Sequence, residues 1–274
     1  MTAYTSVDAR YIVTGLFERA KRYWTIAVLG KIAVACFGLF VAVRPSFAPS
    51  FGIAILIAEA ASLTCFYRAD ALKSQAEPVL MRLDFDESLG WLMPKDYVEE
   101  LSADFGAFKD KGRRIRAGDA YFAPGDTMIG LNRLQKNISE AALYTRTIAG
   151  AARNVIFILF MILFCAVVAV LISGIYRQGF HGTNAAGEFL VAALLVLVTM
   201  DILPLAFKYN TLRCEATRTR RLLSTLSATA PDAKVLPIAI EYQLARTVAP
   251  LLPTYTFLKK RFPLGAIWSA EDDR

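Results

Sequence analysis

The sequence has 274 residues, of which 55% are hydrophobic and 20% are charged, and its formal net charge is +7 at pH 7. Soluble globular chains are usually less apolar and more charged, so the composition argues against a soluble enzyme and is typical of a membrane protein. The positive charge suits anionic membrane lipids at least as well as a nucleic acid, and we expect no DNA or RNA polymer as a partner.

The apolar residues are gathered into four runs, at 24–43, 51–67, 155–175 and 189–207. A bilayer core needs about 20 apolar residues in a helix, because backbone polar groups find no partners in lipid. A buried helical hairpin of a soluble protein is the alternative, but the third run is too long and too apolar for it. The second run follows the first at once, so we interpret the first as a retained span rather than a signal peptide.

The distribution of lysine and arginine predicts the orientation of these spans. The short loops after the first and third runs carry only Arg44 and Arg177 as basic residues, whereas the other polar segments hold most of the lysine and arginine. Positive residues stay on the cytoplasmic side of a membrane. Both termini and the 68–153 segment are therefore expected on the cytoplasmic side of the membrane.

Apolar residues at spacings of three and four continue beyond three of the spans, which places a stripe against a partner helix. The stripes are Ala69, Leu72, Ala76, Val79 and Leu83; Leu131, Leu134, Ile138, Ala141, Thr145 and Ile148; and Leu212, Ala216, Thr219, Leu223 and Leu226. The predicted fold is an all-α membrane protein whose four transmembrane helices extend into a cytoplasmic helical bundle.

We divide the chain accordingly into four parts. Residues 1–67 form an N-terminal helix and the first transmembrane hairpin, and residues 68–153 form a cytoplasmic helical insert. Residues 154–207 form the second hairpin, and residues 208–274 form a cytoplasmic helical tail. Within these parts we expect short helices at 94–108 and 238–248 and a glycine- and arginine-rich loop at 109–124.

No pattern typical of an active site is present, so we expect no enzyme, no catalytic residue, no metal and no cofactor. The single histidine, His181, has no plausible nucleophile near it in the sequence, and no Walker or G-x-G-x-x-G motif occurs. Asp84, Asp86 and Glu87 form an acidic cluster. It is either a divalent cation site or a solvated helix terminus, and we favour the second interpretation.

Three charged residues fall inside the predicted spans: Lys31, Glu59 and Asp201. Charges are costly in lipid and should face another helix or water. Lys31 and Glu59 lie at similar depths, roughly 10–12 Å from the inner surface at about 1.5 Å per residue, and can therefore pair. Their pair either lines a pore or gate, or fixes the register of two helices. Asp201 precedes Pro204, where the helix either moves or has a static kink.

Several short blocks give the chain a family resemblance. They are Phe17 to Arg22 before the first span, Phe85-Asp86 with Leu89 and Trp91 after the second, and Glu241-Tyr242, Ala249-Pro250-Leu251-Leu252-Pro253 and Tyr255 in the tail. In these blocks and in its layout of two spans, a helical insert and two more spans, the chain resembles the SMODS-associated four-transmembrane effector family.

The resemblance implies an effector of bacterial antiphage defence. Such a protein lies in the bacterial inner membrane, and it responds to a cyclic oligonucleotide by assembling into a homo-oligomer and permeabilising that membrane. The phosphates and bases of that ligand need cationic and aromatic partners. Two candidate patches have such residues: Arg113, Arg114 and Arg116 with Tyr121 and Phe122, and Arg218, Arg220 and Arg221. Both patches can equally be solvated or lipid-facing basic surfaces.

Two other functions remain open from the residues alone. The first is a small ion channel or transporter subunit, in which the intramembrane charges form a relay, although no inverted repeat is present. The second is a membrane scaffold whose cytoplasmic bundle binds a protein, since the apolar stripes suit that role equally well.

Overall fold

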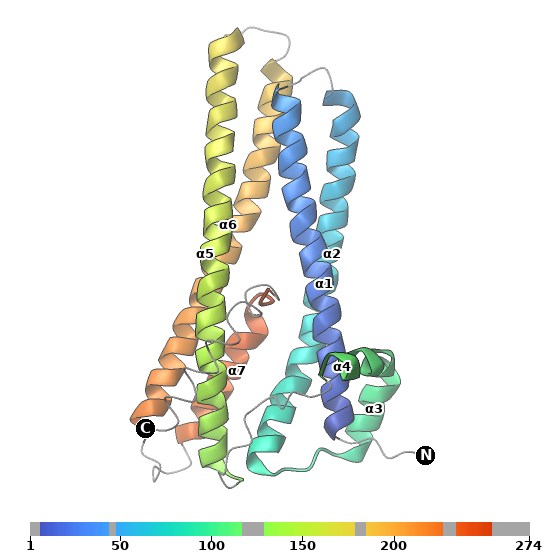
Figure 1. Cartoon of the computed structure of the whole chain (residues 1–274), viewed down its shortest axis with the longest axis vertical. Helices are drawn as coiled ribbons and strands as arrows, with labels where there is room; N and C mark the ends of the chain where they lie inside the picture. Colours follow the sequence, from blue (N-terminus) through green and yellow to red (C-terminus); the bar gives the residue numbers. More distant parts are fainter. Residues whose placement is uncertain (1–5, 44–47, 117–128, 179–184, 227–233, 254–274) are drawn as a thin grey trace. The chain divides into compact units, whose positions relative to one another are not determined.

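The structure is a computed structural model that describes residues 6–43, 48–116, 129–178, 185–226 and 234–253. Every regular element within these ranges is helical, which confirms the predicted all-helical class. Figure 1 shows the helices, which are α1 (Ser6–Val43), α2 (Ala48–Leu89), α3 (Lys95–Phe105), the 3-10 helix η2 (Gly106–Phe108), α4 (Lys109–Arg116), α5 (Leu131–Gln178), α6 (Ala185–Thr225) and α7 (Val235–Val248).

Three described helices are long and apolar enough to cross a membrane, within the stretches Val7–Val41, Phe51–Leu89 and Leu131–Ala166. A bilayer core takes up about 20 residues of helix, so the apolar runs at 24–43, 51–67 and 155–175 are sufficient. The predicted fourth run, 189–207, belongs to α6, but most of its side chains lie outside the described residues.

The apolar runs expose large hydrophobic side chains. Ile53 is 65% exposed, and Leu56, Ile158 and Ile162 are 64%, 59% and 61% exposed. Soluble proteins rarely present an apolar surface of this extent to water, whereas lipid is a suitable surrounding for it. The described helices are therefore those of a multi-pass membrane protein.

The chain forms two compact units. We call the first the bundle unit, and the second, which contains the apolar runs, the apolar unit. The bundle unit comprises Met1–Arg22, Ala69–Gly150 and Asn210–Arg274, and the apolar unit comprises Tyr23–Arg68 and Ala151–Tyr209. Each of α1, α2, α5 and α6 is a single helix with residues in both units.

The bundle unit has two hydrophobic cores that share α2. One joins α1, α2 and α3, and includes Ile12, Leu16, Val79 and Val98. The other joins α2, α5, α6 and α7, and includes Phe85, Leu134, Ile138, Leu223 and Tyr242. All three predicted apolar stripes contribute buried residues, so the 3,4 spacing identified their packed faces correctly.

Glycines shape the end of α2 and the approach to α5. Gly90, at φ 72°, follows the last residue of α2 in the left-handed conformation that ends many helices. Gly130, at φ 146°, precedes α5, and its amide donates to the Ser88 carbonyl at 2.9 Å. Asn137 on α5 also donates to the Ser88 hydroxyl at 2.9 Å. The start of α5 is thereby fixed to the end of α2.

The loop predicted at 109–124 is wrong over residues 109–116, which form α4. The glycine that suggested a loop, Gly112, instead permits close packing of α4 on α1. A Cβ added at Gly112 would overlap the Tyr11 carbonyl oxygen, and one added at Gly15 would overlap the Phe108 carbonyl oxygen. Backbone contact of this kind needs glycine. Residues 117–124 lie outside the described residues.

Gly15→Ala is expected to destabilise the bundle unit, because neither backbone can retreat from the added methyl group. Overpacking of this kind costs about 1–3 kcal/mol. The matched control is Gly106→Ala. Gly106 is also helical, with nothing within 4 Å of an added Cβ, so its replacement should be neutral or slightly stabilising. Thermal unfolding of the detergent-solubilised chain measures both, and equal midpoints would contradict the contact between α1 and η2.

Candidate functional site

The C-terminal helix α7 is held in the bundle unit by polar groups of α2. The Lys73 ammonium donates to three backbone carbonyls at the end of α7, those of Arg246 at 2.8 Å, Thr247 at 2.6 Å and Ala249 at 2.6 Å. The last carbonyls of a helix have no partner within it and carry partial negative charge. Lys73 therefore serves as a buried cationic cap for α7.

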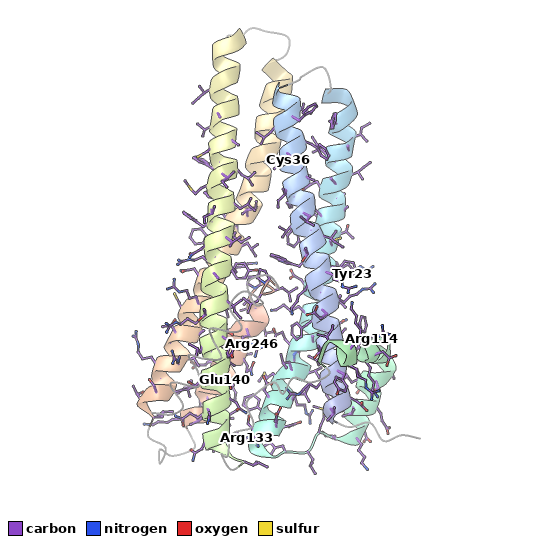
Figure 2. The ribbon with its side chains drawn as sticks, in the orientation of Figure 1. Tyr23, Cys36, Arg114, Arg133, Glu140 and Arg246 are labelled. Atoms are coloured by element: carbon purple, nitrogen blue, oxygen red, sulfur yellow. The ribbon has the colours of Figure 1, made fainter. Side chains whose placement is uncertain are left out.

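Arg246 of α7 completes this arrangement from the other side; it is labelled in Figure 2. Its guanidinium lies 3.6 Å from Glu77 and 3.7 Å from Asp84, and it donates to Gln243 at 3.0 Å. Gln243 in turn donates to Asp84 at 3.2 Å. We call Lys73, Glu77, Asp84, Gln243 and Arg246 the charge network.

The charge network is buried, which makes it energetically demanding. Lys73, Glu77, Asp84 and Gln243 are 5%, 5%, 2% and 1% exposed. Burial lowers the pKa of Lys73, and the Glu77 carboxylate opposes that shift. Buried charges are tolerated only with good partners, and loss of one partner is costly. The network fixes the position of α7 strictly and makes that position sensitive to any change of charge.

The interpretation of Asp84, Asp86 and Glu87 as a solvated helix terminus is wrong. Asp84 and Asp86 are buried, because α3, α5 and α7 cover this end of α2. Glu87 pairs with Arg10 of α1. No group of three potential metal ligands occurs among the described residues. The acidic cluster instead belongs to the interior that joins α1, α2 and α7.

Among these acidic groups, Asp84 has the most strongly shifted pKa. It lies 17 residues beyond the end of the apolar run of α2, about 25 Å along the helix. Burial raises the pKa of its carboxyl group from 3.8 to about 6, although Arg246, Arg10 and Gln243 favour ionisation. Its Oδ1 atom has no hydrogen-bond partner among the described residues. Ionised Asp84 therefore destabilises the folded bundle unit.

The free energy of unfolding of the unaltered chain, compared with that of the Asp84→Asn variant, is expected to increase as the pH falls from about 6.5 to about 4. In that window the folded state keeps a proton on Asp84 that the unfolded state has lost, so acidification favours folding. A shift from 3.8 to about 6 corresponds to about 3 kcal/mol. Thermal unfolding of both proteins across this pH range measures the difference, and parallel profiles would contradict it.

In the apolar unit, the predicted ion pair between Lys31 of α1 and Glu59 of α2 is present. Lys31 is 4% exposed. The second carboxylate oxygen of Glu59, Oε2, has no hydrogen-bond partner among the described residues. The carboxylate is therefore satisfied only in part, and Glu59 keeps capacity for one further donor.

The helices approach closely beside this pair. Ser62 of α2 donates to the Ala27 carbonyl of α1 at 2.8 Å, and a Cβ added at Gly30 would lie 3.1 Å from the Ser62 Cβ. A cavity of about 30 Å³ adjoins Lys31, which is room for about one water molecule. Its other lining residues are apolar: Val28, Ile32, Phe66, Ile156, Leu159, Ile202 and Leu205. These small residues let α1 and α2 pack closely beside the ion pair.

The remaining predicted site residues are not brought together. Arg113 and Arg114 are exposed on α4, whereas Arg218 and Arg221 are exposed on α6, with Arg220 half-buried. Arg218 lies 3.7 Å from Glu215. Tyr121 and Phe122 lie outside the described residues, as do the side chains of Arg116 and Asp201.

The charge network was missed because its parts are distant in the sequence. Lys73 contacts carbonyl groups 173 to 176 residues away. The family resemblance did point to this region of the chain, because Tyr242 and Ala249 belong to the tail block that carries the resemblance. The Tyr242 hydroxyl lies 2.7 Å from the Thr145 hydroxyl, and the Ala249 carbonyl accepts from Lys73.

Comparison of the chain with protein-family models, with curated proteins and with solved structures gave no match in any of the three.

Proposed function

We propose that this chain is a membrane effector that permeabilises the bacterial inner membrane during antiphage defence. A cyclic oligonucleotide triggers it, and several copies assemble in the membrane. The proposal includes four spans, the fourth at 189–207, with the bundle unit and both termini in the cytoplasm. The family resemblance supports the biological role, and the excess of basic residues flanking the runs supports the orientation.

The observation that carries the proposal is the continuity of α2. Its apolar part holds Glu59, the partner of Lys31, and its polar part holds Lys73, Glu77 and Asp84 of the charge network. A ligand that alters the charge balance around α7 acts directly on a helix that also belongs to the apolar unit. Buried, partly satisfied charges are suited to such a switch, because small changes alter their energy strongly.

Of the two basic patches, we assign the nucleotide to Arg218, Arg220 and Arg221 of α6. These residues lie at least 11 positions beyond the apolar run that ends at 207, or about 16 Å along the helix. That distance keeps them away from the lipid headgroups and accessible to a soluble anion. Arginine is well suited to phosphate, since its guanidinium binds it through two parallel hydrogen bonds.

The test is dye leakage from liposomes that contain the purified chain, with and without a panel of cyclic oligonucleotides. We expect leakage with one nucleotide only, and its loss in the triple variant Arg218→Gln, Arg220→Gln, Arg221→Gln. The control variant, Arg113→Gln with Arg114→Gln, should leak like the unaltered chain. Leakage without nucleotide would support a constitutive channel, and no leakage from inserted protein would support a scaffold.

A further inference from the structure

Four basic residues form a surface where α4 packs on α1. They are Arg19 and Arg22 of α1 and Lys111 and Arg114 of α4, and we call them the α1–α4 basic surface. The contact through Gly15 and Gly112 holds α4 against α1 at backbone distance. Arg114, labelled in Figure 2, is exposed on α4. The surface is therefore assembled from two helices that cannot separate without losing this contact.

Three cations of this surface, those of Lys111, Arg22 and Arg19, lie close enough to repel one another. Burial lowers the pKa of Lys111, and the nearby positive charges of Arg22 and Arg19 lower it further, with Glu18 opposing them. Glu18 already pairs with Lys21 at 2.8 Å. Like charges that lie together on a protein repel one another, and an anion bound between them relieves this repulsion.

The other acidic residues of this region are Asp8, which pairs with Lys109 at 2.9 Å, and Asp110 of α4. Within the described ranges, neither Arg22 nor Arg114 forms an ion pair. The α1–α4 basic surface thus carries more positive than negative charge, so it favours an external anion.

The position of this surface along α1 indicates which kind of anion it binds. Arg22 is two residues before Trp24, where the first apolar run begins, and Arg19 is five residues before it. At about 1.5 Å per residue, both lie within about 8 Å of that run along the helix axis. This is the depth of lipid headgroups when the run crosses a membrane. Ile115, the neighbour of Arg114, is 48% exposed.

We infer that the α1–α4 basic surface binds the phosphate of an anionic phospholipid in the leaflet that meets the start of the first apolar run. The guanidinium groups of Arg22 and Arg114 and the ammonium group of Lys111 then bind the phosphate, with Arg19 beside them. The inference goes beyond the proposed function and does not depend on it. It requires only that the apolar part of α1 lies in a bilayer.

Native mass spectrometry of the full-length chain in detergent tests the inference, with phosphatidylglycerol and phosphatidylcholine as probes. We expect the chain to retain phosphatidylglycerol in preference to phosphatidylcholine. Each basic residue near a membrane surface contributes about fivefold to affinity for anionic lipid. The variant Arg22→Gln, Lys111→Gln, Arg114→Gln should therefore bind phosphatidylglycerol at least about tenfold more weakly. The single exposed change Arg114→Gln should weaken binding by about fivefold even if the triple variant folds poorly.

The matched control removes the same charge elsewhere, with Arg218→Gln, Arg220→Gln and Arg221→Gln on α6, and should leave phosphatidylglycerol binding unchanged. Equal loss in the control and the α1–α4 variant would overturn the inference, because net charge alone would then explain binding. Competition by glycerol phosphate at the same concentration as the lipid would also overturn it, since the site would then take a soluble anion.

Discussion

Lys73→Met is expected to lower the free energy of unfolding by about 3–5 kcal/mol, the usual cost of breaking a buried ion pair from one side. The substitution removes all three hydrogen bonds to the carbonyls of Arg246, Thr247 and Ala249. It also leaves the buried carboxylate of Glu77 with one ion-pair partner among the described residues, Arg246 at 3.6 Å. Methionine fills the volume of the lysine stem, so lost polar contacts rather than a cavity would explain the effect.

Two measurements separate release of α7 from general unfolding. Thermal unfolding in detergent reports the total loss of stability, and cleavage by trypsin after Arg246 reports whether α7 has detached. The control is Lys234→Met, at an exposed position just before α7, which should change neither result. Unchanged trypsin sensitivity in the Lys73 variant would show that Lys73 does not hold α7 in place.

The described helices of this fold could be predicted well from periodicity, because their packed faces are formed by local spacing. The stripe of α6 is an example: Leu212, Ala216, Thr219 and Leu223 are all buried as the 3,4 pattern predicts. The failure at 109–116 has a tertiary cause. Gly112 disfavours a helix locally, but packing against α1 compensates for that weak propensity.

The charged residues of the candidate site likewise include some that could be predicted from the sequence and some that could not. The Lys31–Glu59 pair could be predicted, since both residues belong to consecutive helices of one hairpin at matching depth. Lys73 and Asp84 could not, because α7 covers them and follows more than 150 residues later. Their sequence neighbourhood is polar and resembles any solvated helix end. A buried charge is recognised as such only when the covering element is known.

Replacing either Lys31 or Glu59 by leucine alone is expected to destabilise the chain by about 3–5 kcal/mol, because the remaining charge then lies among apolar residues without its partner of the ion pair. The double replacement should recover most of this loss, since two apolar side chains are well tolerated there. The half-buried pair Lys21–Glu18 of the bundle unit is the control. Leucine at either of its positions should cost less than about 1 kcal/mol. Expression level and thermal unfolding in detergent measure all of these variants.

The double variant also separates a role in packing from a role in function. Ser62 and Gly30 already bring α1 and α2 together beside the pair, so register should survive without the charges. Glu59 Oε2 is without a partner among the described residues, which favours a role for a water molecule or a group of another copy. We therefore expect the stable double variant to lose ligand-dependent dye leakage. Full leakage would show that the ion pair only fixes the register of the two helices.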